Sequence, residues 1–514
     1  MKKNYLSFLH QHLGFFLFLI MLLIGLLTFD SYGISWDESV SRTNGVISAT
    51  YAFSDDNRLL TWKDRDYGVA FEIPLVVLEK TFNLTDSRSI YLMRHLVTHL
   101  FFLLSCFYLF LLIDYLYKNK LLATVGFFLL ILNPAIYAHS FFNTKDIPFL
   151  SMFIICFYYF VKAFDKKTLL SFIKLGLCAG LLINIRIMGI LIVLAALLIL
   201  ILDIFKAQEK QKQLKLLIVF VITTFLTLYI SWPFLWNNPL NNFAYAFENM
   251  SNFRWESSVL FNGELIKATD LSWNYIPTWF TITTPIVYLV LGTFGFLLLL
   301  FHFFKTPSAF LENSIQRTNL IFLGFFVAPL VAVILFHSVL YDGWRQMYFI
   351  YPSFILLAIY GLSHLFRKNN KTFIVSLGFL IITFMFTSIY MIRNFPLQGV
   401  YFNEAFSFSS PEYLRKNYEM DYWGVSYKQS LEYILKVDSS TSIDIAVEND
   451  PGIYNLHILP PSERKRIKIV PRENATYFIT NYRWHPQDYS EYADFKFYSF
   501  LVGNNTVSEI FKFK

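Results

Sequence analysis

Two adjacent acids, Asp37 and Glu38, follow the first long apolar run of the chain by only a few residues. If that run spans a membrane, both carboxylates lie near the depth of the lipid headgroups. A carboxylate there could accept a proton from a substrate hydroxyl or bind a divalent cation. An ordinary acidic loop would show the same residues, so the pair predicts a catalytic site only in company with other polar groups.

A second polar cluster, residues 143–148, separates two later apolar runs. Pro148 suits the first turn of a helix, and Thr144 or Asp146 could cap that helix. A helix N-terminus with a lysine beside it is a natural phosphate site, because its amides and dipole favour an anion. Lys145 is therefore a candidate phosphate ligand and Asp146 a supporting group. Capping with an interfacial lysine is the simpler alternative.

Arginines supply the remaining candidates. Arg345 stands at the outer start of another apolar run, and its guanidinium matches a phosphate bidentately. Arg186 and Arg94 are candidates of the same kind, and Asp342 is a candidate supporting residue beside Arg345. An interfacial anchor is the alternative role for Arg345.

The sequence leaves the cofactor unassigned, with a divalent metal or none as the two alternatives. Asp37, Glu38 and Asp146 could share a metal ion. His95 and His99 lie one helical turn apart, but two neutral histidines inside a helix bundle explain that spacing more simply. The three cysteines lie within apolar runs and form neither a disulfide framework nor a zinc spacing.

Long apolar runs separate these polar clusters. The chain has 514 residues, of which 55% are hydrophobic and 15% charged; soluble proteins carry about 25% charged residues. The first run has no small-residue cleavage site after it, which predicts an uncleaved span. We expect an α-helical polytopic membrane protein with about eleven spans, near 13–29, 91–113, 121–138, 147–164, 169–185, 188–205, 214–232, 279–303, 318–338, 347–366 and 372–391.

Lysine-rich connectors alternate with the polar clusters along the chain. Lys118, Lys167 and Lys210 lie in three such connectors, and Lys2 and Lys3 open the chain. The positive-inside bias then predicts a cytoplasmic N-terminus, and an odd number of spans predicts a C-terminus outside. The candidate residues, with the loops 31–90 and 233–278, therefore share the outer face. The formal net charge of +7 reflects this topology, and no basic tract predicts a nucleic-acid partner.

The chain divides into a membrane domain, residues 1–395, and a more charged tail, residues 396–514. Within the tail, residues 430–436 are typical of an amphipathic helix, and residues 442–447 and 467–470 of strands. We expect a small α/β domain outside the membrane.

The shared outer position of these groups indicates the substrate. An acid pair and several cations gather at the membrane–water boundary, contributed by different loops. A molecule with an anionic head and a long apolar tail suits such a place, and a polyprenyl-phosphate sugar fits that description.

The layout also resembles the C-type membrane glycosyltransferases (the GT-C superfamily), which use polyprenyl-phosphate sugars and include protein O-mannosyltransferases and bacterial lipid A aminoarabinose transferases. An acidic motif in the first outer loop marks that superfamily. The segments that carry the resemblance are Trp36-Asp37-Glu38, residues 143–148, Leu340 to Pro352, Tyr401 to Glu404 and Met420 to Lys428. The mannosyltransferases carry a large β-trefoil insert that this chain lacks, having only residues 233–278 there.

The resemblance implies a hexosyl- or pentosyltransferase of the bacterial inner (plasma) membrane that inverts the anomeric centre. Asp37 would take the proton of an acceptor hydroxyl, and Glu38 or Asp146 would orient the partners of Asp37 or hold a metal ion. Lys145 and Arg345, with Arg186 and Arg94, would bind the donor phosphate. The partners implied are the lipid-linked donor, membrane lipids and an acceptor that could be a glycan, a lipid or a protein.

Two other classes remain open on the sequence: a transporter or flippase of a lipid-linked or anionic solute, and a non-catalytic membrane scaffold. Transporters place ionisable groups near the bilayer midplane, whereas the central turns of these runs are nearly free of charge. Convergence of Asp37, Lys145 and Arg345 would favour the enzyme, because neither alternative requires it.

Overall fold

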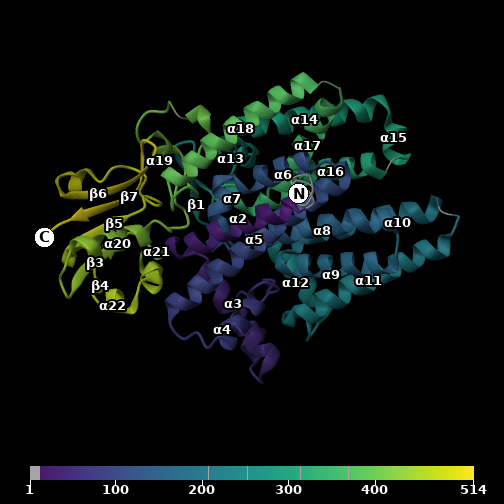
Figure 1. The fold of residues 1–514 in the computed structure, drawn as a ribbon. Helices are drawn as coiled ribbons and strands as arrows, with labels where there is room; N and C mark the ends of the chain where they lie inside the picture. The colour runs from purple at the N-terminus through teal and green to yellow at the C-terminus, as the bar shows by residue number, and fades with distance from the viewer. Residues whose placement is uncertain (1–11, 207, 252, 313, 369, 407) are drawn as a thin grey trace, which may run out of the picture.

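The computed structural model describes residues 12–514, apart from residues 207, 252, 313, 369 and 407. Lys2 and Lys3, which the sequence analysis places in the cytoplasm, lie outside the described residues. The described part consists mainly of long helices, with a small sheet at the C-terminal end (Figure 1). This arrangement confirms the predicted fold class, a polytopic helical membrane protein with a small C-terminal α/β region.

In the described part, nine helical segments are long and apolar enough to cross a membrane. Their main helices are α2 (Leu13–Thr28), α5 (Ser87–Tyr117), α8 (Asp146–Lys166), α10 (Ile190–Lys206), α11 (Lys210–Ser231), α14 (Ile286–Lys305), α16 (Ser314–Leu335), α17 (Tyr351–Lys368) and α18 (Asn370–Arg393).

Two of the eleven expected spans are not single long helices: one is a bent pair of helices and the other is a shorter helix. Helices α6 (Lys120–Ile131) and α7 (Pro134–Phe142) form a pair bent by 66°. The bend follows from Asn133, whose side chain caps α7 at Ile136 N over 3.1 Å, and from Pro134, which has no amide proton to continue α6. Helix α9 (Leu169–Ile185) has only 17 residues.

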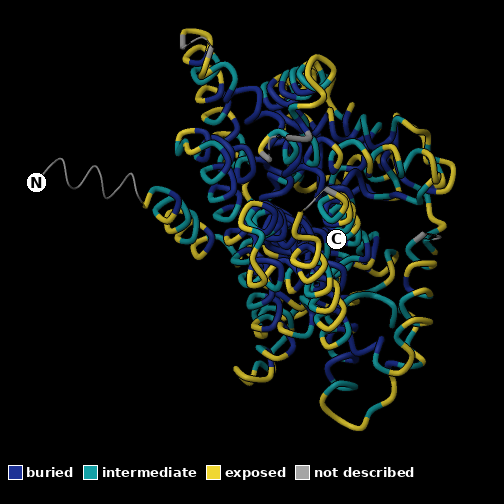
Figure 2. Tube along the Cα trace, turned by 90° about the vertical axis from the view of Figure 1, so that its right-hand side faces the viewer, coloured by how far each residue is buried: buried dark blue, intermediate teal, exposed yellow. Residues whose placement is uncertain are grey.

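The spans are buried to different degrees. In α8 and in the segment Arg345–Arg367, 83% of the most apolar window is buried, against 11% in α2 and 22% in α18. Figure 2 shows this gradient, with dark blue segments in the middle of the molecule and exposed turns at its edges. The exposed apolar helices are suited to contact lipid tails. Where α14 and α17 cross, a Cβ on Gly295 would lie 1.8 Å from Leu357 O, so only glycine permits this close approach.

The predicted outer loops contain short elements of their own. The first loop holds α3 (Glu38–Phe53) and α4 (Glu72–Thr81). The second holds α12 (Pro239–Ser251), the antiparallel hairpin of β1 (Ser258–Phe261) and β2 (Glu264–Lys267), and α13 (Tyr275–Ile282). The span expected from residue 279 therefore begins later, at Ile286, because α13 ends before Pro285.

The C-terminal part contains a five-stranded mixed sheet in the order β4-β3-β5-β7-β6. Strand β3 pairs in parallel with β4 and β5, while β7 is antiparallel to β5 and β6. The elements are α19 (Tyr413–Asn417), α20 (Tyr427–Val437), β3 (Ile443–Val447), α21 (Pro451–Tyr454), α22 (Pro461–Arg464), β4 (Ile467–Ile469), β5 (Tyr477–Thr480), β6 (Lys496–Val502) and β7 (Asn505–Lys512). The expected helix at 430–436 and strands at 442–447 and 467–470 correspond to α20, β3 and β4.

Several hydrophobic clusters hold this part in place. Leu431 and Ile434 of α20 pack with Ile445 and Ile479 of the sheet. Tyr418 and Trp423, by contrast, belong to the large core formed by the membrane helices. The division at residue 396 stays a prediction, since the segment up to residue 425 packs with the spans.

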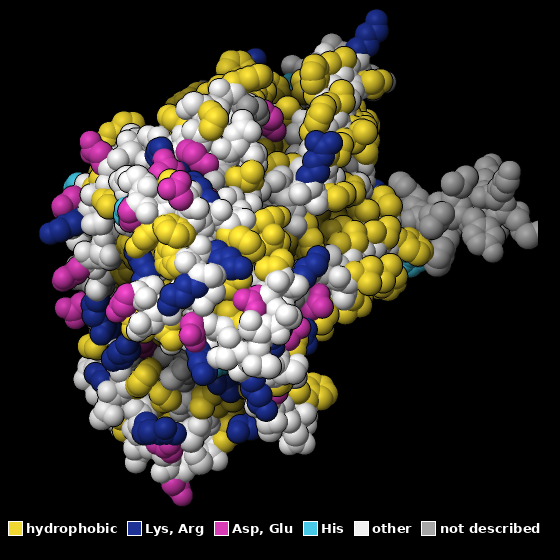
Figure 3. All heavy atoms as spheres, turned by 90° about the vertical axis from the view of Figure 1, so that its left-hand side faces the viewer, with side chains coloured by type: hydrophobic (Ala, Val, Ile, Leu, Met, Phe, Trp, Pro, Cys, Tyr) yellow, Lys and Arg dark blue, Asp and Glu magenta, His cyan; other side chains and the backbone are white. Residues whose placement is uncertain are grey.

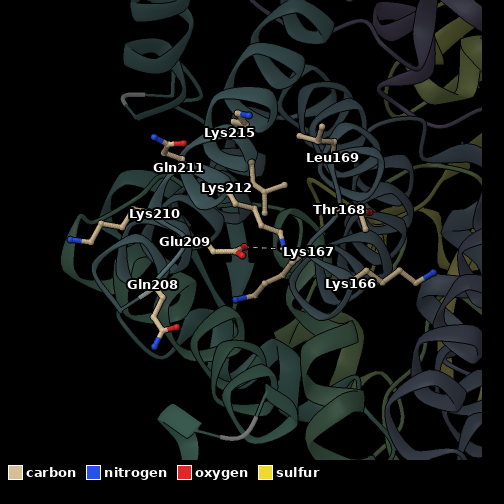
Figure 4. A pocket seen from close by; sticks show the side chains of 11 residues that line it. Lys166, Lys167, Thr168, Leu169, Gln208, Glu209, Lys210, Gln211, Lys212 and Lys215 are labelled. Carbon is tan, nitrogen blue, oxygen red and sulfur yellow. Dashed lines mark ion pairs between the residues drawn. The ribbon is translucent and has the colours of Figure 1, made fainter.

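The two ends of the helix bundle differ in charge. Figure 3 shows charged side chains of both signs over the face that carries the C-terminal sheet, beside a mainly hydrophobic flank. At a distance from the sheet, the α8–α9 and α10–α11 connectors line a hollow of about 870 Å³ with Lys166, Lys167, Lys210, Lys212 and Lys215 (Figures 1 and 4). These connectors therefore share one end of the bundle, as expected; its cytoplasmic location stays a prediction.

Candidate functional site

A buried guanidinium, that of Arg345, lies at the centre of the candidate site. Arg345 begins the short 3-10 helix η6 (Arg345–Ile350), which leads into α17. Its side chain is 2% exposed and contacts three carboxylates: Asp342 at 3.0 Å, Asp146 at 3.1 Å and Asp37 at 3.5 Å. The three acids come from three separate polar segments of the sequence, which the fold therefore brings together.

Asp37 is the accessible carboxylate of this group. It is the N-cap residue of α3, and its side chain is 30% exposed, against 1% for Asp146 and 6% for Asp342. Its 3.5 Å contact with Arg345 is also the longest of the three. Asp37 is therefore placed to meet a ligand, whereas Asp146 and Asp342 have mainly internal partners.

Asn143 holds the polar segment 143–148 in place through its side chain. Its Oδ1 accepts hydrogen bonds from the backbone amides of Asp146 at 2.8 Å and Lys145 at 3.2 Å, and its Nδ2 donates to the Asp146 carboxylate at 2.8 Å. Asn143, rather than Thr144 or Asp146, thus caps the start of α8. Relieved of that role, the Asp146 carboxylate pairs with Arg345 and with Arg186.

Lys145 has an aromatic partner. Its ammonium lies 4.6 Å from the centre of the Tyr67 ring. Burial raises the pKa of Tyr67, and the nearby carboxylates of Asp64 and Asp37 raise it further. Tyr67 is therefore neutral and stands close to Asp37 as well as to Lys145. Among the described residues, Lys145 forms no ion pair with a carboxylate.

Aromatic rings also cover Arg345. Its guanidinium carbon lies 4.9 Å from the Tyr341 ring and 4.5 Å from the Trp423 ring. Burial raises the pKa of Tyr341, so its hydroxyl is also neutral. These rings exclude water from the guanidinium, which strengthens its interaction with any charge placed beside it.

Two site residues escaped the sequence analysis. Arg483, after β5, donates to the Asp342 carboxylate at 2.7 Å, so Asp342 bridges Arg345 and Arg483. The Arg483 guanidinium also lies 5.0 Å from the Trp36 ring. Glu419 lies nearby: burial raises its pKa to about 8, a rise that Arg483 and Arg345 oppose and Asp342 increases. No pattern in the tail marks either residue.

Two expected members lie in a different cluster. Arg94 is fully buried and pairs with Glu72 and with Glu79, the latter at 3.4 Å. Glu38 pairs with His95 at 3.1 Å and accepts a hydrogen bond from the Ser35 amide at 2.8 Å. The structure therefore does not bring Arg94 and the Glu38 carboxylate to the Arg345 cluster.

The arrangement does not assemble a metal site from the expected ligands. Glu38 faces His95, whereas Asp37 and Asp146 face Arg345. His99 bonds to Ser140 at 2.7 Å. Among residues that the structure describes, no group of three or more His, Cys, Asp or Glu side chains is arranged to hold a metal ion.

Several buried donors in the cluster have no hydrogen-bond acceptor within the described protein. They are the Nε groups of Arg186, Arg345 and Arg483 and the indole nitrogen of Trp423. A buried donor without an acceptor costs about 1–3 kcal/mol. The cluster therefore retains hydrogen-bond donors that no described acceptor satisfies.

One stretch of the chain matches a family of known proteins. Residues 82–232 match the family described as dolichyl-phosphate-mannose-protein mannosyltransferase. The sequence has no significant match among curated proteins. The matched region includes Lys145, Asp146 and Arg186 but not Asp37 or Arg345.

Solved structures that are similar at low identity include the following three. ArnT from Cupriavidus metallidurans bound to undecaprenyl phosphate is 12% identical, with 96% of this chain and 97% of that chain covered and a TM-score of 0.45. The apo oligosaccharyltransferase of Archaeoglobus fulgidus is 11% identical, with 90% and 65% covered and a TM-score of 0.45. The archaeal oligosaccharyltransferase AglB from the same organism, with an inhibitory peptide and a dolichol-phosphate, is 11% identical, with 92% and 70% covered and a TM-score of 0.43. The family match confirms, over residues 82–232, the resemblance to the C-type membrane glycosyltransferases that the loop motifs indicate.

Proposed function

We propose that this protein transfers a sugar from a polyprenyl-phosphate donor to a hydroxyl group of an acceptor outside the cytoplasm. The observation that carries the proposal is the meeting of Asp37 with Arg345 at 3.5 Å, next to Asp146 and Arg186. This places an accessible carboxylate beside the buried cation Arg345 and the partly exposed cation Arg186, as a reaction with a hydroxyl nucleophile and a phosphate leaving group requires. The family match over residues 82–232 adds support.

The reaction is a direct displacement at the anomeric carbon. The acceptor oxygen attacks C1 of the sugar while Asp37 takes the hydroxyl proton, a contribution of about 10²–10⁴-fold in rate. The bond between C1 and the phosphate oxygen breaks, and its electron pair leaves with the polyprenyl phosphate. Attack from the face opposite the leaving group inverts the anomeric centre.

Lys145 is the cation best placed to bind the donor phosphate. Arg345 already contacts three carboxylates, and Arg186 pairs with Asp146. Lys145 is held by the Tyr67 ring alone among the described partners, so its full charge remains for the phosphate. Arg345 holds Asp37 in place, and its buried positive charge stabilises negative charge nearby. Arg94 pairs with Glu72 and Glu79 and takes no part in the reaction.

The proposal includes finer assignments that rest on the resemblance. The sugar is a hexose or a pentose, and the acceptor is a glycan, a lipid or a protein. The protein lies in the bacterial cell membrane with its N-terminus in the cytoplasm and its C-terminal part outside, which puts Asp37 on the side where a lipid-linked sugar is presented.

The test is a transfer assay with the purified full chain in lipid vesicles, labelled polyprenyl-phosphate sugars and candidate acceptors. We expect labelled product whose anomeric configuration is opposite to that of the donor. Product with retained configuration would contradict direct displacement. Movement of the labelled lipid across the vesicle membrane without any transfer would instead favour the flippase alternative.

A further inference from the structure

The segment Asp421–Lys428, here called the turn segment, contributes the Trp423 ring over Arg345 but has no other role in the reaction as described so far. In the structure it lies against residues 30–36, here called the approach segment, which lead from α2 to Asp37. Trp36 N donates to Trp423 O at 3.1 Å, and Lys428 Nζ donates to Asp30 O at 2.7 Å. Two stretches almost 400 residues apart in the chain are thus bonded to each other.

Asn455 forms the central link between them. Its Oδ1 accepts a hydrogen bond from Ile34 N at 2.8 Å, and its Nδ2 donates to Ile34 O at 3.0 Å. The same Nδ2 lies 3.1 Å from Gly424 O in the turn segment. A single fully buried side chain therefore satisfies both backbone groups of Ile34, as a neighbouring strand would.

The fit at this link leaves no room for adjustment. A Cβ on Gly33 would lie 2.4 Å from Asn455 Oδ1 and 2.4 Å from Val425 O. The carboxylate of Asp421 accepts hydrogen bonds from Val425 N at 3.2 Å and Ser426 N at 2.9 Å, which fixes the shape of the turn segment. A rigid surface therefore faces the backbone just before Asp37.

We infer that Asn455 is a positioning residue that sets the place of Asp37 by holding the approach segment against the turn segment. The inference rests on the proposed function, because it treats Asp37 as the base. A displacement of about 1 Å at a reacting group can cost about a hundredfold in rate. The turn segment thereby acquires a role: it is the surface on which the backbone leading to Asp37 is fixed.

The first test is kinetic and uses the variant Asn455→Asp in the full chain. Aspartate keeps the size and the Oδ1 acceptor but removes the amide donor to Ile34 O, Gly424 O and Pro451 O. We expect kcat to fall at least about tenfold, with KM for the donor changed by less than about threefold, because donor-binding groups are untouched.

The matched control is Asn505→Asp. Asn505 is also buried in the C-terminal part, where its Oδ1 accepts from Leu414 N at 2.9 Å, far in sequence from the approach segment. We expect its kcat to stay within about twofold of that of the wild type. An equal loss of kcat in both variants would overturn the inference, since general destabilisation would then explain the effect.

A second readout does not depend on activity. Amide hydrogen exchange at Ile34 and Trp36 should become at least about tenfold faster in Asn455→Asp, since loss of the Nδ2 bonds to Ile34 O and Gly424 O lets the approach segment separate from the turn segment more often. Unchanged exchange would overturn the inference, and so would faster exchange with wild-type kcat. Gly33→Ala, which forces the same two segments apart, should speed exchange at the same amides.

The two proposals fail in different ways. Full activity of Asp37→Asn would remove the proposed role of the base, while the exchange result for Asn455→Asp would still report on the link. Loss of activity in Asp37→Asn with normal kcat in Asn455→Asp would overturn the positioning role alone.

Discussion

At the scale of single residues, the candidate site is a balance of buried charges. Arg345 holds Asp37, Asp146 and Asp342, and Arg483 shares Asp342. Burying so many ionised groups is stable only when each has a partner. Two charged groups differ from this pattern of burial and pairing. Asp37 is partly exposed, and Lys145 contacts an aromatic ring instead of a carboxylate.

Lys145→Gln tests the phosphate ligand. Loss of the positive charge should raise KM for the donor and lower kcat/KM by about 10²–10³-fold, because the leaving phosphate loses a fixed cation. Lys145→Arg should recover much of that loss. Lys63→Gln, on the exposed part of the same outer region, is the control and should be neutral. Wild-type donor kinetics in Lys145→Gln would exclude this lysine as the ligand.

Glu419 predicts a pH-dependent stability. Burial raises its pKa in the folded protein to about 8, from an ordinary 4.5. Between these two pKa values the folded state keeps a proton that the unfolded chain releases. The free energy of unfolding therefore falls as the pH rises from about 4.5 to about 8. Glu419→Gln removes that loss, and its melting temperature should exceed that of the wild type by more at pH 8 than at pH 5.

Thermal unfolding of detergent-solubilised protein measures this difference. Glu473→Gln, at an exposed site, should show the same pH dependence as the wild type. A constant difference between Glu419→Gln and the wild type across pH 5–8 would contradict the raised pKa.

At the scale of elements, helix starts position the site. Asp37 immediately precedes α3, Asp146 is the first residue of α8 and Arg345 is the first residue of η6. Helix ends recur here because several spans end at one boundary, where the unsatisfied amides of their first turns face polar groups. The start of α8 is the best defined of these, through the three hydrogen bonds of Asn143.

Asn143→Ala tests that helix start. Loss of the cap should cost about 0.5–2 kcal/mol of stability and should also lower kcat, because Asp146 and Lys145 lose their support. The control is Asn119→Ala, which removes a similar cap from α6 at Leu121 N and Leu122 N at a distance from the site. Unfolding and transfer assays should show similar destabilisation in both variants, with a loss of kcat only in Asn143→Ala.

At the scale of the whole molecule, the basic connectors lie at one end of the bundle and the C-terminal sheet at the other (Figure 1). Arg483 of the C-terminal part pairs with Asp342 of the candidate site. The positive-inside bias predicts that the basic end is cytoplasmic. Reporter fusions at Lys118 and at the C-terminus should therefore report opposite sides of the membrane. Reports from the same side would contradict the expected odd number of crossings.

The sequence predicted much of this architecture because hydropathy identifies spans directly. It also singled out Asp37, Lys145 and Arg345 as candidate site residues, because their residue types stand out at span ends. It could not group Arg94 with Glu72 and Glu79, because α4 lies inside what looks like a polar loop. Arg483, in the same way, reaches Asp342 only through the docking of the C-terminal part.

The capping role of Asn143 was within reach of the sequence. Asparagine is among the best N-cap residues, and this one stands three residues before Asp146. The bent pair α6–α7 was likewise marked by Asn133 and Pro134, a cap followed by a proline. The links between residues 30–36 and Asn455 had no such signal, because they join backbone groups to a side chain distant in sequence.

The most direct measurement of the central claim compares Asp37→Asn with the wild type in the transfer assay, with donor binding measured on the same preparations. Asparagine keeps the size of the side chain and cannot accept the proton. The account predicts at least about a hundredfold lower kcat with donor affinity within about threefold of the wild type. Full turnover by well-folded Asp37→Asn protein would contradict Asp37 as the base and the mechanism built on it.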